Sequence, residues 1–209
     1  MSWQQQDEVW LGLGDYVAGG SCSPPFLKSE GALARRPIVM GSMDLSDGRD
    51  AYDAAMMWAD SGADGMMIRV TSEEELPTVA MIAQVTGLPI ALSGDPAVVS
   101  AMASAIEGTV MILMGADAEG HVSAGQNGRI AVFDGLDADA MHAFRLAGLK
   151  GDESCKKPIL ADLSMFPGEP MEEAMVGLEA MLCGADILIM NNPVAADMCR
   201  SQGEELAGL

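Results

Sequence analysis

The chain has 209 residues, of which 49% are hydrophobic, so it is long enough to form one domain with a sizeable core. Eleven Lys and Arg residues against 31 Asp and Glu residues give a formal net charge of −20, which repels nucleic-acid phosphates and anionic lipids. Nucleic acid and membranes are therefore not expected as partners. Because the sequence has no apolar run long enough for a membrane span and no signal-peptide pattern at its start, we expect a cytoplasmic protein.

The cysteines and methionines indicate no metal chemistry. The four cysteines lie far apart, without the paired spacing of a zinc or iron–sulfur site, so we expect reduced thiols and no iron–sulfur cluster in this chain. Many of the 18 methionines fall inside apolar runs, where a flexible thioether fills gaps in a core. We therefore interpret them as core residues.

From residue 37 onward, short apolar runs alternate with Ala-rich helical stretches that end in glycine, which predicts repeated βα units. Residues 1–36 are predicted as an N-terminal extension or hairpin and 37–209 as a barrel-like domain. Strands are expected at 37–44, 64–70, 89–94, 109–115, 129–134, 158–164 and 185–192. Helices are expected at 50–62, 73–87, 96–108, 137–151 and 170–184, with a last one from residue 193.

Residues 116–129 interrupt this pattern, because they are polar, rich in glycine and aperiodic. They are interpreted as a loop on the active face or a hairpin. A closed (βα) barrel needs eight strands and typically about 250 residues, and only seven strands are predicted. Two architectures stay open: a shortened or incomplete TIM-barrel-like α/β domain, which we favour, and an open doubly wound sheet. An incomplete barrel would expose apolar edges, which predicts a homo-oligomer or a complex with another chain.

Three stretches carry a family resemblance. Residues 19–44 contain a glycine pair, Pro-Phe, Glu-Gly and an Arg-Pro-Ile that enters the first predicted strand. Residues 144–162 contain Arg-Leu-Ala-Gly-Leu-Lys-Gly-Asp before another strand, and residues 184–198 begin with Gly-Ala-Asp-Ile-Leu-Ile-Met-Asn-Asn-Pro. In this order the stretches resemble the TIM-barrel delta subunit of the corrinoid protein in the CO dehydrogenase/acetyl-CoA synthase complex, although family members are longer.

The resemblance implies a barrel that pairs with a larger corrinoid and iron–sulfur subunit. Such a barrel would help to enclose cobalamin while a methyl group passes between a tetrahydropterin carrier and acetyl-CoA synthase. The cofactor expected from the resemblance is thus a cobalamin shared with the partner, or a methyl-tetrahydropterin. Two alternatives remain: a stand-alone pterin-binding methyltransferase, and a non-catalytic barrel that serves as an assembly scaffold.

Candidate site residues follow from position, because working residues of βα barrels lie at the C-terminal ends of the strands. That rule selects Asp44, Arg69, Ser93, Gly94, Asp95, Gly115, Asp117, Asp162, Ser164, Asn191 and Asn192. Of these, Asp162, Asn191, Asn192, Gly94, Gly115 and Ser164 are predicted to line a cofactor site.

Most of these candidates also have an ordinary structural explanation. Asn191 and Asn192 could bind a pterin or a corrin amide, but Asn192 precedes Pro193 and could instead cap a helix. Gly94 and Gly115 could admit a ligand closely or form tight turns. Asp162 lies within an apolar run and is equally suited to a site or to a structural partner. His121 is expected to be a solvated loop residue.

Overall fold

The computed structural model describes residues 9–13, 16–20, 36–47, 50–106, 108 and 111–207. Two antiparallel strands, β1 (Val9–Leu13) and β2 (Tyr16–Gly20), form a hairpin. The parallel strands are β3 (Ile38–Asp44), β4 (Gly65–Val70), β5 (Ile90–Gly94), β6 (Met111–Met114), β7 (Val122–Ala124), β8 (Ala131–Asp134), β9 (Ile159–Asp162) and β10 (Ile187–Met190). The helices are α1 (Ala51–Asp60), α2 (Leu76–Thr86), α3 (Pro96–Ala105), α4 (Ala138–Leu149), α5 (Pro170–Leu182) and α6 (Pro193–Ala207).

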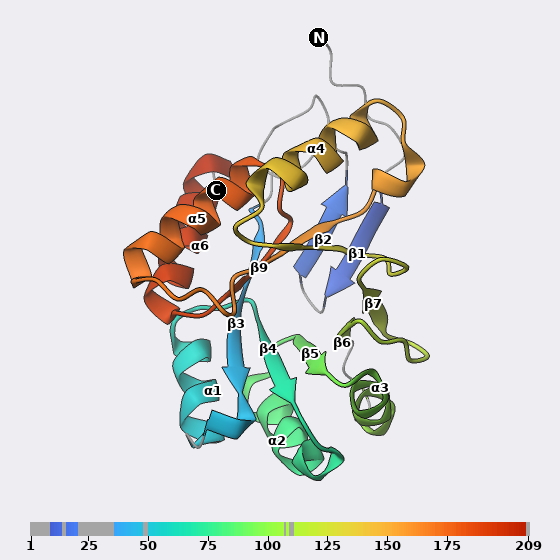
Figure 1. Ribbon diagram of the computed structural model, residues 1–209. Coiled ribbons are helices and arrows are strands. Elements are labelled where there is room, and N and C mark those ends of the chain that lie inside the picture. Colours follow the sequence, from blue (N-terminus) through green and yellow to red (C-terminus); the bar gives the residue numbers. More distant parts are fainter. Residues whose placement is uncertain are drawn as a thin grey trace.

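The eight parallel strands form one sheet in the order β7-β6-β5-β4-β3-β10-β9-β8. The two ends of this sheet meet through an isolated bridge between Ala124 and Ile130, with hydrogen bonds of 3.0 Å from Gly125 N to Ile130 O and of 2.8 Å from Arg129 N to Ser123 O. The sheet is therefore a nearly closed, TIM-like barrel with helices outside it (Figure 1). The prediction of a TIM-barrel-like α/β fold is confirmed.

The prediction of seven strands is wrong, because residues 116–129 contain the eighth. Strand β7 is only three residues long; Val122 and Ala124 are buried inside the barrel and Ser123 points the other way. Among the described residues, no helix follows β6 or β7. The chain fits eight strands into its length by omitting these two helices.

Side chains alternate along each strand between the barrel interior and the helices. The interior is filled by residues of β3 to β7, β9 and β10, by Ile130 just before β8 and by Ala18 of the β1–β2 hairpin, with Val132 of β8 packed against them. The strand residues are Ile38, Met40, Met67, Ala91, Ile112, Val122, Ala124, Leu160, Ile187 and Ile189. Strand β2 contacts β3, and the hairpin lies at the end where the barrel strands begin (Figure 1). The opposite, C-terminal end of the barrel is therefore the end left for a ligand.

Methionines supply much of the buried volume, as predicted. Met40, Met66, Met67, Met111 and Met190 are fully buried in the strands. Cys199 is buried too, and burial raises the pKa of its thiol to about 12, so it is inert at neutral pH. Cys155 and Cys183 are free and half-buried, while Cys22 lies outside the described residues.

The division of the chain at residue 36 stays a prediction, and so does the cytoplasmic location. Within the described residues, the helices are too short or too polar to cross a membrane.

Candidate functional site at the C-terminal end of the barrel

Two carboxylates stand side by side at the C-terminal end of the barrel. Asp134 ends β8 and Asp162 ends β9, and the two residues are register partners in the sheet. Each lies two positions after a residue of the barrel interior, Val132 on β8 and Leu160 on β9, and so faces the same side of the sheet. The carboxylates therefore point to the barrel mouth, where Asp134 is exposed and Asp162 is half-buried.

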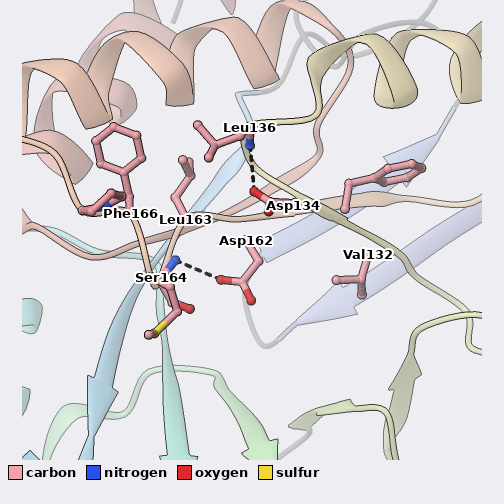
Figure 2. A pocket seen from close by; sticks show the side chains of 10 residues that line it. Val132, Asp134, Leu136, Asp162, Leu163, Ser164 and Phe166 are labelled. Atoms are coloured by element: carbon pink, nitrogen blue, oxygen red, sulfur yellow. Dashed lines mark hydrogen bonds between the residues drawn. The ribbon is translucent and has the colours of Figure 1, made fainter.

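Backbone amides of the following loops hold both carboxylates, as Figure 2 shows. Asp134 Oδ1 accepts from Leu136 N at 3.0 Å, and Asp162 Oδ1 accepts from Ser164 N at 2.9 Å. Among the described residues, neither carboxylate forms an ion pair with a Lys, Arg or His side chain. Each keeps acceptor capacity that can be used by a ligand.

These carboxylates line a cavity of about 290 Å³. Its walls are Val132 and Phe133 of β8, Leu136, and the segment 162–167 that follows β9, including Phe166 (Figure 2). Ligand pockets are typically about 300–1,000 Å³ and combine apolar walls with a few polar groups. The cavity lies just below that range, a size that suits a flat heterocycle.

A second cavity, of about 510 Å³, adjoins the first across Ser164 and Met165, which line both. It is bounded by the ends of β3, β4 and β10, by Trp58 of α1 and by Asn191, Asn192 and Pro193. Its one charged pair of register partners is Asp44 on β3 and Arg69 on β4.

The residues of this second cavity are held by local contacts. Arg69 Nη1 donates to Met165 Sδ at 3.0 Å and Nη2 to Ser164 Oγ at 3.5 Å. Asp44 Oδ1 accepts from Ser46 N and Ser46 Oγ, and these bonds, more than the charge of Arg69, lower the pKa of Asp44. The ends of β3 and β4 thus keep opposite charges that do not form an ion pair.

Asn191 and Asn192 have different roles. Asn192 Oδ1 accepts from Val194 N at 2.9 Å and so caps α6. This is the helix-capping role that the sequence analysis offered as the alternative to ligand binding. Asn191 is exposed and its Nδ2 makes only a long bond of 3.4 Å to Phe166 O. The Asn191 amide therefore remains available at the mouth.

Glu173 of α5 holds the backbone of this asparagine pair in place. It is buried, and its Oε1 accepts from Asn191 N at 2.5 Å and from Asn192 N at 3.2 Å. Burial raises the pKa of Glu173, and the two amide bonds offset part of that rise. Its position could not be predicted from the sequence, because a lone glutamate in an amphipathic helix is normally solvated.

The glycine candidates have backbone roles and line neither cavity. A Cβ at Gly94 would lie 2.2 Å from Val70 O, so glycine is needed for the approach of β5 to β4. Gly115 has a φ of +73° and forms the turn after β6. Likewise, Asp95 caps α3 by accepting from Ala97 N and Val98 N.

His121 is not a solvated loop residue, contrary to the expectation. Met111 N donates to its Nδ1 at 3.2 Å, and its Nε2 lies 3.0 Å from Ala103 O. Because Nδ1 accepts a hydrogen bond, Nε2 carries the proton, and the ring links α3 to β6. Its role is structural.

Asp134 is the site residue that the sequence analysis missed. It ends the predicted strand 129–134, so the strand-end rule that selected Asp162 would also have selected it. Ser164, by contrast, was selected and is buried between the two cavities. Within the described residues there is no group of three or more His, Cys, Asp or Glu side chains that could hold a metal ion.

No protein-family model matches the chain, and no curated protein matches it either. The resemblance to the delta subunit is therefore not confirmed. Solved structures do match. Dihydropteroate synthase from Yersinia pestis is 14% identical with a TM-score of 0.61, covering 96% of this chain and 100% of that one. The Burkholderia cenocepacia enzyme, complexed with 7,8-dihydropteroate, is 15% identical with a TM-score of 0.57, covering 97% and 99%.

A barrel of a different activity is about equally similar. N-acetylneuraminic acid synthetase from Leptospira borgpetersenii, in complex with citrate, is 12% identical with a TM-score of 0.58, covering 96% of this chain and 90% of that one. At such low identity the likeness concerns the fold. This chain has the TIM-like barrel fold of dihydropteroate synthase, with fewer helices around it.

Proposed function

We propose that this protein binds a pterin at the C-terminal end of its barrel. The observation that carries the proposal is the pair of carboxylates, Asp134 and Asp162, that line one small cavity without a cationic partner among the described residues. The 2-amino-4-oxopyrimidine edge of a pterin presents neighbouring N–H donors, which a carboxylate can accept in pairs. Asn191, nearby at the end of β10, supplies an amide that can donate and accept.

Two further facts support a pterin as the ligand. The cavity walls include Val132, Phe133 and Phe166, which provide apolar contact for a flat ring. Several of the similar barrels were solved with pterin compounds, including the complex with 7,8-dihydropteroate. Of the functions considered above, the pterin-binding protein is therefore favoured over the scaffold.

The corrinoid part of the expectation has less support. None of the similar structures described above is a corrinoid protein. Cobalamin and the larger partner subunit stay predictions. A visible absorption spectrum of the purified protein and its mass by light scattering would test them.

The test of pterin binding is a titration of the protein with 6-methyltetrahydropterin under anaerobic conditions, followed by calorimetry. We expect saturable binding that Asp162→Asn weakens by roughly 10- to 100-fold, because a hydrogen bond to a charged group contributes about 1.5–3 kcal/mol. Asp60→Asn is the matched control, since Asp60 is exposed at the end of α1 and lines neither cavity. Equal affinities of Asp162→Asn and the wild type would contradict the proposal.

A further inference from the structure

Arg69 lacks the carboxylate partner that three other arginines of the described residues have. Arg36, Arg145 and Arg200 each pair with a carboxylate, whereas Arg69 forms no ion pair among the described residues. The other described cations without an ion pair, Arg129, Lys150 and Lys157, line neither cavity. Its side chain is half-buried in the cavity of about 510 Å³.

The present contacts of Arg69 can be replaced easily. A thioether sulfur such as Met165 Sδ is a weak acceptor, and the bond to Ser164 Oγ is long at 3.5 Å. Met165 itself is 72% exposed and has a flexible side chain, so it can move away. The carboxylate of Asp44 is already engaged by Ser46.

The two cavities therefore offer opposite chemistry. The one beside Asp134 and Asp162 offers acceptors, and the one beside Arg69 offers a planar fork of donors, the geometry that matches carboxylates and phosphates. Ser164 joins them, since its amide donates to Asp162 and its hydroxyl accepts from Arg69. One ligand that spans Ser164 and Met165 would reach both.

We propose that the ligand of this barrel carries an anionic group, a carboxylate or a phosphate, and that Arg69 binds that group in the second cavity. This inference rests on the proposed function, because the ring of the same ligand occupies the cavity of Asp134 and Asp162. The substrate class is then an anionic pterin, such as a folate with its glutamate carboxylates or a pterin phosphate.

The experiment compares two ligands that share one ring. Tetrahydrofolate carries a carboxylate tail and 6-methyltetrahydropterin has none; both are titrated anaerobically into wild type and Arg69→Gln. We expect tetrahydrofolate to bind wild type at least tenfold more tightly than the ring alone. Arg69→Gln should remove that advantage and leave the affinity for 6-methyltetrahydropterin unchanged, which also shows that the variant is folded.

Arg129→Gln is the matched control, because it removes the same charge from an exposed residue that lines neither cavity. Competition by p-aminobenzoylglutamate or by inorganic phosphate then distinguishes a carboxylate from a phosphate as the preferred anion. If 6-methyltetrahydropterin does not bind wild type, the proposed function fails and this inference with it. If it binds, but tetrahydrofolate binds no more tightly or Arg69→Gln weakens both ligands alike, the inference alone is wrong.

Discussion

Two arginines at the N-terminal end of the barrel strands, one half-buried and one buried, pair with buried aspartates, whereas at the C-terminal end Arg69 and two aspartates line cavities without an ion pair among the described residues. Arg36 binds Asp64, and Arg145 binds Asp186. Both aspartates follow a Gly-Ala pair that precedes a strand. Each also accepts a backbone N–H from the neighbouring strand, Val39 N at 2.9 Å for Asp64 and Ile159 N at 2.8 Å for Asp186.

This difference indicates that the two ends of the barrel have different roles. At the N-terminal end the charges are neutralised within the chain, and the aspartates fix neighbouring strands to each other. At the C-terminal end the charged groups keep capacity for a ligand. The comparison predicts that charge removal is costly for stability at the first end and costly for binding at the second.

The largest expected effect is that of Asp186→Asn. Arg145 is only 5% exposed and Asp186 only 2%, so the variant leaves a buried guanidinium without its counter-charge. Breaking a buried ion pair on one side typically costs about 3–5 kcal/mol. We expect a loss of that size in the free energy of unfolding, measured by urea denaturation at pH 7.

Asp162→Asn is the counterpart at the other end. Asp162 is half-buried and pairs with no cation among the described residues, so its loss should lower the free energy of unfolding by less than about 1 kcal/mol. Equal losses for Asp186→Asn and Asp162→Asn would contradict the division of roles between the two ends.

A pH-dependent effect is expected at Glu173, a buried carboxylate at the ligand end. Its raised pKa means that the folded state holds the proton more tightly than the unfolded chain, whose value is near 4.5. The contribution of this group to stability is therefore present at low pH and is lost as the pH rises through the folded pKa. Glu173→Gln cannot titrate and keeps one oxygen to accept from Asn191 N.

Urea midpoints of wild type and Glu173→Gln at pH 5, 6, 7 and 8 test this expectation. The stability of the variant relative to wild type should rise with pH and then level off. A constant difference across this range would show that Glu173 does not titrate within it. Cys199, whose thiol lies close to Glu173, stays neutral throughout.

The contrast also explains which features could be predicted from the sequence. Long apolar strands bounded by glycine were predicted, because burial on both faces leaves a continuous apolar run. Strand β7 was missed because its three residues lie in a polar, glycine-rich segment and only tertiary packing buries Val122 and Ala124. Asp162 and Asn191 were found by their place at strand ends.

The arrangement of the site could not be predicted in the same way. The two cavities share Ser164 and Met165, and that depends on the path of the segment after β9. The support that Glu173 gives to Asn191 joins residues 18 positions apart on different elements. Neither feature has a pattern in the sequence.

The smallest effect is expected for Asp197→Asn, which tests whether location or burial decides the cost. Asp197 pairs with Arg200 of α6 at 2.9 Å, and Arg200 also pairs with Glu204, which contacts Arg36 at the same end as Asp64. The Asp197 side chain is 54% exposed and that of Arg200 27%, and exposed pairs typically contribute about 0.2–1 kcal/mol because water and salt screen them. Because Arg200 keeps Glu204 as a partner, we expect a loss below about 0.5 kcal/mol that shrinks further in 1 M NaCl. A loss close to that of Asp186→Asn would mean that position at this end, rather than burial of the pair, sets the cost.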